Sequence, residues 1–577
     1  MIKNFILLYS VIALFNPMRA SQPNVIFILT DDQGYGDLSC HGNPILKTPA
    51  LDRLYSESIR FTDMHVNSFC TPTRASIMTG HYATRTGAYR TSSGRSLMHK
   101  DEVTMAEVFR DNGYATGIFG KWHLGDNYPH RPQDRGFEET LWHRCGGVGQ
   151  ASDYWGNDYF DDVYERNGNF ELFEGYCTDV FFEGALDFIK KKGQSEDPFF
   201  VYLATNAPHT PFRVAEEYEA PYKEVAQWRN GGAAKFYGMI ANIDENVARL
   251  REKLKDWSLE DNTILIFMTD NGTAGGVEMD TDALPAEGMG YNAGMRGRKA
   301  SVYDGGHRVP CFFFWPEGKL TGGRDVGTLA AGYDLLPTLI DLCGLRNPNI
   351  IFDGTSLGPL LRGNSRDWKH RELVLQYQGG NGFTYLPEPY RDSAVLTQQW
   401  RLIDGNKLFD IEKDPSQSED VSAKYPEVVE RLRKRYEGWW EEVSPRMSPI
   451  RVHLGNPAEN PVLLTSQDWY MPVGNPPLKF DKLPKQTGPW IVEVERAGRY
   501  RISLCQWPLE AKRPILAKSA RLKIGKQEKS ASVKSGALSV DFEMKLSNGY
   551  ANLETFFTNE SGEVGGAYYT YVEFLEE

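Results

Sequence analysis

The chain has 577 residues, a net charge of −13 and an apolar content of 41%, which is an ordinary globular composition. This length is too great for one compact core and predicts two or three domains. The negative charge argues against nucleic acid and against an anionic membrane surface as partners, so any anion-binding site must be built from a few local cations.

The first 20 residues are typical of a signal peptide. Lys3 provides the charged start, residues 5–15 form an apolar run, and Ala20-Ser21 offers a cleavage point. The run is too short to span a membrane, and no later run is both apolar and long enough to do so. We therefore predict a secreted or periplasmic protein without a membrane span.

Polar residues follow the ends of four predicted strands. The strands are apolar segments that alternate with helical patterns, at residues 24–30, 114–119, 198–204 and 262–269. Such alternation predicts an α/β fold with a large, mainly parallel sheet sandwiched by helices. The polar residues after these strands are Asp31, Asp32, Lys121, His123, His209, Asp270 and Asn271. Because ligands of open α/β sheets bind at the carboxyl ends of the strands, we expect one shared site.

Two pairs of oxygen-bearing side chains stand among these residues. Asp31 and Asp32 are adjacent carboxylates, which repel each other unless a cation neutralises them. Turn capping explains many such pairs, but Asp270 and Asn271 supply a second pair after another strand. Because hard divalent cations favour several oxygen ligands, the two pairs favour a Ca²⁺ site, with Mg²⁺ as the alternative ion.

Cys70 stands at the start of a predicted helix. Pro72 suits a first helical turn, and residues 75–78 can continue the helix. The free N–H groups at that end favour an anion, although most lone cysteines are buried core residues. The seven cysteines show no Cys-x-x-Cys spacing, so a zinc site is not indicated.

The segment around Cys70 resembles the formylglycine motif of the sulfatases, a family of the alkaline phosphatase-like superfamily. It is Cys70-Thr71-Pro72-Thr73-Arg74, followed by Thr79-Gly80, with Thr73 where the commonest family form has serine. In that family a formylglycine-generating or maturase enzyme oxidises the motif cysteine to an aldehyde, and the hydrated aldehyde is the nucleophile. The resemblance implies this modification at Cys70.

Three further segments resemble sulfatase motifs. Gly120-Lys121-Trp122-His123-Leu124-Gly125 matches a second family motif residue for residue. Residues 297–310 are similar to a third motif that contains Lys299, with alanine for glycine at position 300 and aspartate for glutamate at position 304. His209 lies in a loop that resembles the family's Pro-His-x-Pro segment. The resemblance covers roughly residues 22–445.

What the resemblance implies is a sulfuric ester hydrolase in which Ca²⁺ holds a sulfate oxygen and polarises the nucleophile. The implied metal ligands are Asp31, Asp32, the oxidised Cys70, Asp270 and Asn271. Arg74 would anchor the modified side chain, and Lys121 and Lys299 would bind sulfate oxygens and offset developing charge. His209 would protonate the leaving oxygen, and His123 would take a proton from the second hydroxyl, because histidine titrates near neutrality.

The sequence pattern changes after about residue 370. Short predicted strands and a helix at 426–443 are similar to the small antiparallel C-terminal subdomain of sulfatases. From about residue 451, short alternating segments predict an appended all-β domain of β-sandwich type, here called the tail. We predict a catalytic domain over residues 21–370, the subdomain over 371–450 and the tail over 451–577.

The sequence says less about the identity of the substrate than about the reaction. The signal peptide and the β-rich tail favour a sulfated glycan over another sulfated small molecule, although the tail fits equally well as a scaffold on the catalytic domain. The loop residues that we predict to line the substrate pocket are His143, Arg144, Asp153, Tyr154 and Arg213.

Two alternative functions stay open from the sequence. One is a phosphate or phosphonate ester hydrolase of the same superfamily, because some of those enzymes also use formylglycine. The other is a catalytically inactive carbohydrate-binding protein, whose signature would be the loss of site residues. None of those residues is missing from this sequence.

Overall fold

The structure is a computed structural model that describes residues 22–195, 197–225, 232–275, 290–366, 368–377, 388–470 and 486–576. The signal peptide predicted at residues 1–20 lies outside these described residues. Within the described ranges, no helix is long and apolar enough to cross a membrane.

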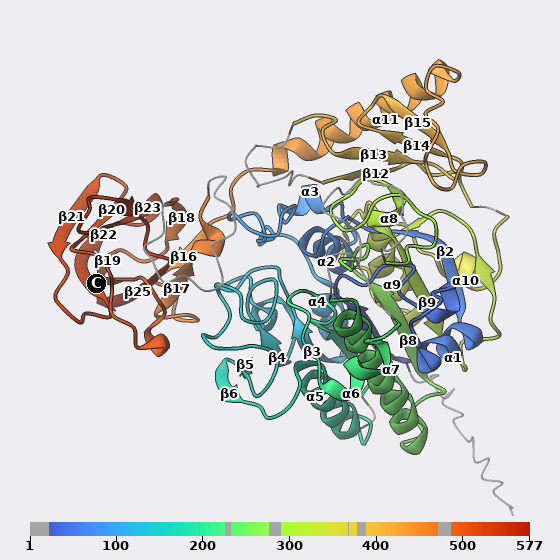
Figure 1. The fold of residues 1–577 in the computed structure, drawn as a ribbon, viewed down its shortest axis with the longest axis horizontal. Helices are drawn as coiled ribbons and strands as arrows, with labels where there is room; N and C mark the ends of the chain where they lie inside the picture. Colours follow the sequence, from blue (N-terminus) through green and yellow to red (C-terminus); the bar gives the residue numbers. More distant parts are fainter. Residues whose placement is uncertain are drawn as a thin grey trace, which may run out of the picture.

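A large mixed sheet forms the centre of the molecule (Figure 1). Its strands, in spatial order, are β10 (Asp325–Val326), β2 (Ile59–His65), β9 (Arg308–Phe314), β8 (Thr263–Thr269), β1 (Asn24–Thr30), β7 (Phe199–Ala204), β3 (Ala115–Lys121), β4 (Glu139–His143), β5 (Val163–Arg166) and β6 (Asn169–Leu172), with β11 (Ala330–Ala331) beside β2. The five central strands, β8-β1-β7-β3-β4, are parallel, whereas β2, β9, β5 and β6 add antiparallel pairings. The sheet is therefore parallel where the predicted site lies.

Helices cover both faces of this sheet, as a buried parallel sheet requires. One layer contains α2 (Cys70–Thr79), α4 (Met105–Asp111), α9 (Leu335–Cys343) and α10 (Gly358–Leu361), and the other contains α1 (Pro49–Glu57), α5 (Cys177–Lys192) and α7 (Ala233–Asp256). Three short helices are α3 (Ala83–Thr86), α6 (Glu216–Glu219) and α8 (Asp304–His307). Along β1, Val25 and Phe27 pack into the first layer and Ile26 into the second. A strand buried on both faces needs such a continuous apolar run, and the fold-class prediction is confirmed.

A small subdomain packs against this unit through a shared apolar cluster and a buried arginine. Its antiparallel strands are β12 (Leu373–Gln376), β13 (Ser393–Leu396), β14 (Trp400–Ile403) and β15 (Lys407–Asp410), and they are joined by α11 (Pro426–Val443). Arg401 of β14 is fully buried and donates to Asp304 Oδ1 at 2.9 Å and to Asp63 Oδ1 at 3.3 Å. Although burial acts to raise the pKa of Asp304, the Arg401 charge and the neighbouring histidines hold that pKa below its usual range.

We expect Arg401→Met to lower the free energy of unfolding by about 3–5 kcal/mol, because it leaves two buried carboxylates without their cation. Urea denaturation followed by tryptophan fluorescence measures this loss. The contribution is present at neutral pH and above the unfolded-state pKa of aspartate, about 3.9. It is lost as the pH falls below that value toward the lower folded pKa.

The matched control for this prediction is Arg249→Met. Arg249 forms an ion pair with Glu183 in which both side chains are exposed, and such pairs contribute no more than about 1 kcal/mol. Equal losses in the two variants would contradict the role of Arg401 as the buried attachment of the subdomain.

The tail is a sandwich of two sheets that docks on the part of the chain built around the large sheet, here called the catalytic unit. It lies on the side where β4, β5 and β6 are found (Figure 1). The first sheet contains β16 (Val452–Leu454), β18 (Trp490–Val494), β23 (Gly549–Thr558), β20 (Ser519–Ile524), β21 (Gln527–Ser532) and β24 (Val564–Gly565), and the second contains β17 (Val462–Thr465), β25 (Tyr569–Glu576), β19 (Gly498–Cys505) and β22 (Val540–Leu546). Trp469 and Trp490 fill the core between the sheets, and Leu97 of the catalytic unit packs into the same apolar cluster. The buried Glu459 carboxylate accepts hydrogen bonds from Asn127 Nδ2 and Tyr128 N. Buried contacts therefore hold the tail in place; the domain boundaries near residues 370 and 450 stay predictions.

Candidate active site

Ten of the predicted site residues meet at the carboxyl edge of the central strands. They are Asp31, Asp32, Cys70, Arg74, Lys121, His123, His209, Asp270, Asn271 and Lys299. Strands β8, β1, β7 and β3 are neighbours in the sheet, so the residues that follow them come together. Helix α2 brings Cys70 and Arg74 to the same edge, and the loop before α8 brings Lys299.

Cys70 is the first residue of α2, as the sequence predicts. The preceding Phe69 is extended and its side chain does not cap the helix, so the first N–H groups of α2 end at the site. The Cys70 side chain is only 2% exposed, and its Sγ lies 3.3 Å from Nδ1 of His123. Burial raises the pKa of the Cys70 thiol, although the charges of Lys121 and Lys299 act to lower it. The position combines a helix amino terminus with nearby cations, which suits an anion.

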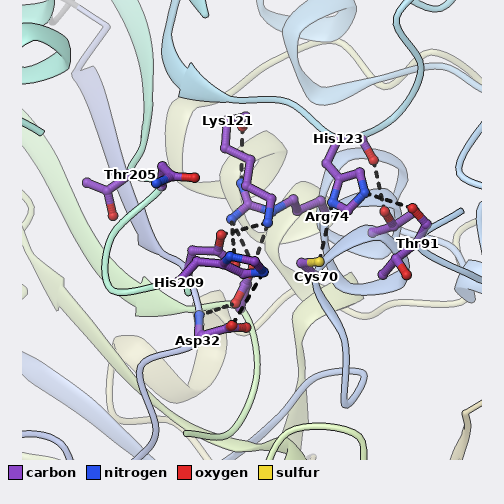
Figure 2. Close-up of polar contacts among 12 residues, drawn as sticks. Asp32, Cys70, Arg74, Thr91, Lys121, His123, Thr205 and His209 are labelled. Carbon is purple, nitrogen blue, oxygen red and sulfur yellow. Dashed lines mark hydrogen bonds and ion pairs between the residues drawn. The ribbon is translucent and has the colours of Figure 1, made fainter. Parts of the chain in front are cut away.

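The His123 ring lies between Cys70 and the main chain of Thr91 (Figure 2). Its Nε2 is 3.0 Å from the Thr91 carbonyl oxygen, which can only accept a hydrogen bond. Nε2 therefore carries the ring hydrogen, and the lone pair of Nδ1 points toward Cys70 Sγ.

Burial, together with the Lys121 charge, places the pKa of His123 well below its usual range. The ring is neutral at neutral pH and available as a base at the Cys70 position.

Three buried carboxylates are matched by three cations. Arg74 donates through Nε and Nη2 to one oxygen of Asp270, at 3.1 and 2.8 Å. Lys121 Nζ lies 2.6 Å from Asp31 Oδ2, and Lys299 Nζ lies 2.6 Å from Asp32 Oδ2. Both partners of the Arg74 and Lys121 pairs are fully buried. The cluster is formally neutral, so a bound dication would make it attractive to an anionic ester.

Two buried oxygens in this cluster have no hydrogen-bond partner among the described residues. They are Asp31 Oδ1 and Asn271 Oδ1. Buried polar atoms of folded proteins are nearly always bonded, so each orphaned oxygen needs an explanation. Ligand atoms of Asp31, Cys70 and Asp270 also lie within 4.8 Å of one another. Burial and the Asp31 charge raise the pKa of Asp270 to about 7. This set of crowded carboxylate and amide oxygens fits a hard divalent ion.

His209 and Lys299 are the more exposed members of the cluster and mark its open side. His209 is 9% exposed, and the Lys299 side chain is 16% exposed, whereas Lys121 is completely buried. His209 Nδ1 donates to the Thr210 carbonyl at 2.6 Å, so its Nε2 is directed into the cluster, 3.6 Å from Asp32 Oδ2 (Figure 2). Burial and the Lys299 charge lower the pKa of His209 to about 3. An anionic ester bound beside the ring would raise that pKa and favour the proton-donating form.

Four of the five predicted pocket residues form hydrogen bonds or ion pairs with residues outside the cluster. His143 ends β4 and is buried, with Nδ1 2.9 Å from the Arg144 carbonyl, and burial lowers the pKa of His143 to about 3. Arg144 donates twice to Glu165. The buried Asp153 accepts from Gly149 N and Asn157 Nδ2, and Arg213 forms an exposed ion pair with Asp158. Residues Arg144, Asp153 and Tyr154 line a pocket of about 240 Å³ between the catalytic unit and the tail.

Four contacts of the site lie outside the residues predicted for it. Thr91 holds His123 through its carbonyl, and Gln467 of the tail donates to the same oxygen. Thr71 Oγ1 donates to the His123 carbonyl, and Arg74 Nη1 donates to Tyr202 Oη. Thr71 lies inside the Cys70 motif, so the sequence could have identified it as a site residue. Nothing in the sequence marks a main-chain carbonyl or a distant residue of the tail as part of the site.

Two protein-family models match this chain. Residues 23–345 match the family model described as Sulfatase, and residues 297–441 match the model described as N-sulphoglucosamine sulphohydrolase, C-terminal. Because the first match spans more than half of the chain and its relatives are sulfatases, the chain belongs to the sulfatase family. It is a sulfuric ester hydrolase.

Individual relatives share much of the chain. Human arylsulfatase A is 31% identical over 470 residues, which cover 72% of this chain and 87% of that protein. Human N-acetylgalactosamine-6-sulfatase is 31% identical over 367 residues, covering 60% and 67%. The crystal structure of Ps i-CgsB in complex with k-i-k-neocarrahexaose has a TM-score of 0.63 and 28% identity, covering 72% of this chain and 92% of that one. A phosphonate monoester hydrolase of Agrobacterium radiobacter shares the fold, at a TM-score of 0.51 and 20% identity over 74% and 96% of the two chains.

Proposed function

We propose that this sulfatase uses a formylglycine made from Cys70 and a bound Ca²⁺, with Mg²⁺ as the alternative ion, to hydrolyse sulfate esters of a carbohydrate. The observation that carries this proposal is a pair of buried oxygens, on Asp31 and Asn271, that have no hydrogen-bond partner among the described residues. They lie in the same cluster as Cys70, which stands at the positive end of α2.

The ion would be held by Asp31, Asp32, Asp270, Asn271 and the modified Cys70 side chain. When present, the ion supplies charge that holds a sulfate oxygen, and the hydrated aldehyde supplies a nucleophilic hydroxyl. The geometry around Cys70 supports this assignment. Arg74 is locked by its two bonds to Asp270, so its guanidinium charge stays beside the Cys70 position.

The remaining residues would bind the ester and move protons. Lys121 pairs with Asp31 and Lys299 pairs with Asp32, and both lysines would bind sulfate oxygens as negative charge builds up. His123 Nδ1 faces Cys70 and would accept a proton there. His209 Nε2, on the open side, would donate a proton to the departing alcohol oxygen.

A sulfated carbohydrate is the substrate class we favour. Ps i-CgsB, 28% identical over most of its length, is found with an oligosaccharide bound. The predicted signal peptide agrees with a protein that meets such polymers outside the cytoplasm, in the periplasm or after secretion. A maturase enzyme would first convert Cys70 to formylglycine.

Activity on matched esters tests this proposal. We expect release of inorganic sulfate from aryl sulfate and from at least one member of a panel of sulfated mono- and oligosaccharides, measured by ion chromatography. The corresponding aryl phosphate should be a much poorer substrate. A strong preference for phosphate would overturn the sulfate assignment, and an absence of any ester hydrolysis by the converted enzyme would overturn the proposed catalysis.

His209→Ala should affect the two substrate classes differently. We expect kcat/KM for a sugar sulfate to fall about 10²- to 10⁴-fold, because a sugar alkoxide leaves poorly without a proton donor. An aryl sulfate leaves as a stable phenolate, so the same variant should lose much less activity with it. Steady-state kinetics with both substrates provides the comparison within one protein, and equal losses would contradict the role of His209 as the acid.

A further inference from the structure

We infer that Gln467, a residue of the tail, is a positioning residue for His123 and acts through the main-chain carbonyl of Thr91. This inference deepens the proposed function, on which it rests. It makes the tail part of the catalytic apparatus in addition to any role in binding glycans.

The contact chain is short and largely buried. Gln467 Nε2 donates to the Thr91 carbonyl at 2.6 Å, and His123 Nε2 lies 3.0 Å from the same oxygen. His123 Nδ1 in turn lies 3.3 Å from Cys70 Sγ. Gln467 is 7% exposed and His123 is 4% exposed. Both lone pairs of one carbonyl are therefore used, one by the tail and one by the ring that faces the nucleophile position.

The loop that carries Thr91 needs such an anchor. Residues 87–104 contain no helix or strand, so no regular hydrogen-bond ladder fixes the Thr91 carbonyl. Gln467 makes two hydrogen bonds to this loop. Its side-chain Nε2 donates to the Thr91 carbonyl, and its main-chain carbonyl accepts from Ser93 N at 2.8 Å. Arg95 also lies over the ring of Tyr470, 4.5 Å from its centroid. Residues of the tail thus hold the loop whose Thr91 carbonyl orients His123.

The function of this contact is to fix the ring tautomer of His123. A carbonyl held in place at 3.0 Å keeps the hydrogen on Nε2 and leaves Nδ1 as the acceptor toward Cys70. If the carbonyl moves away, the ring can rotate or carry its hydrogen on Nδ1, which removes the base from the Cys70 position. In the proposed reaction this base acts at the stage that releases sulfate, after the alcohol has left.

Gln467→Met tests the inference, because methionine has a similar length and no amide donor. We expect kcat for an aryl sulfate to fall about 10- to 100-fold, as is typical for loss of an outer-shell partner. KM should fall along with kcat, and rapid-mixing kinetics should show a burst of alcohol followed by slow release of sulfate. A fall in kcat/KM with no burst would overturn the assignment to the sulfate-release stage.

A second readout does not depend on activity. In ¹⁵N-histidine-labelled protein with Cys70 unconverted, the neutral His123 ring should carry its hydrogen on Nε2, with the signal assigned through His123→Gln. Gln467→Met should introduce the other tautomer. A wild-type ring with the hydrogen on Nδ1 would overturn the inference, whereas a wild-type enzyme that releases no sulfate would overturn only the proposed function.

Thr465→Val is the matched control. It removes the contact of 2.5 Å between Thr465 Oγ1 and Ser152 Oγ, which also joins the tail to the catalytic unit but does not reach Thr91. We expect wild-type kinetics and a wild-type His123 tautomer. If Thr465→Val and Gln467→Met behave alike, Gln467 contributes only to docking of the tail and the inference is wrong.

Discussion

Cys70→Ala is expected to abolish sulfate release while leaving the protein folded. Alanine cannot be oxidised to an aldehyde, so the variant lacks the nucleophile, and removing a catalytic nucleophile typically costs about 10⁴-fold or more in turnover. The thiol is small, and the hydrogen bond found for it is the 3.3 Å contact with His123. The fold should therefore tolerate its loss. Turnover of aryl sulfate, together with thermal unfolding, measures both effects.

Cys311→Ala is the matched control for this prediction. Cys311 is another buried cysteine, on β9 in the apolar core, where burial alone raises its pKa. Its loss should leave turnover unchanged, with a small fall in stability. The nucleophile assignment would be contradicted if Cys70→Ala stayed active, and a failure of Cys70→Ala to fold would indicate a structural cysteine.

Asp31→Asn should weaken Ca²⁺ binding strongly and lower the activity at limiting Ca²⁺. Asp31 is completely buried, its Oδ1 has no hydrogen-bond partner among the described residues, and its Oδ2 pairs with Lys121. The amide keeps the shape but gives the cluster an excess positive charge that opposes a dication. Two unit charges 4 Å apart interact by about 4 kcal/mol at an effective dielectric constant near 20, and the interaction with a dication is about twice as large. We therefore expect Ca²⁺ affinity to fall at least about 10³-fold, as measured by calorimetric titration, and kcat/KM at limiting Ca²⁺ to fall with it.

The control for the metal site is Asp37→Asn. Asp37 is also buried and lies in the turn after β1, but its carboxylate accepts from Gly34 N and is not among the proposed ligands. Burial raises the pKa of Asp37 to about 7, so a neutral amide should be well tolerated. This variant should bind Ca²⁺ like the wild type. Unchanged Ca²⁺ affinity in Asp31→Asn would contradict the proposed ligand set.

Local sequence pattern was enough to predict the parts of the site that depend on a single strand or helix. Residues 24–30 are apolar on both faces, so they form a central strand, and Asp31 and Asp32 must then stand at its carboxyl edge. Pro72 and the small residues after it place Cys70 at the start of α2. The directions of β2 and β9 depend on pairing between residues about 250 positions apart, and no local pattern shows them.

Contacts through the main chain and across domains were beyond the sequence for a physical reason. Every residue has a carbonyl, so nothing marks Thr91 as the partner of His123. Gln467 lies 376 positions from Thr91 and meets it only because the tail docks beside this loop. Arg144 was predicted from its loop to line the substrate pocket, but whether its charge is available depends on Glu165, which the sheet brings alongside it.

Mass spectrometry of the peptide around Cys70 shows whether this side chain is converted to formylglycine. The protein should be isolated from its native host, and turnover should be measured on the same preparation. We predict a peptide in which the CH₂SH group of Cys70 has become CHO, with sulfate release proportional to the converted fraction. An active preparation that contains only unmodified cysteine at position 70 would show that formylglycine is not the nucleophile of this enzyme.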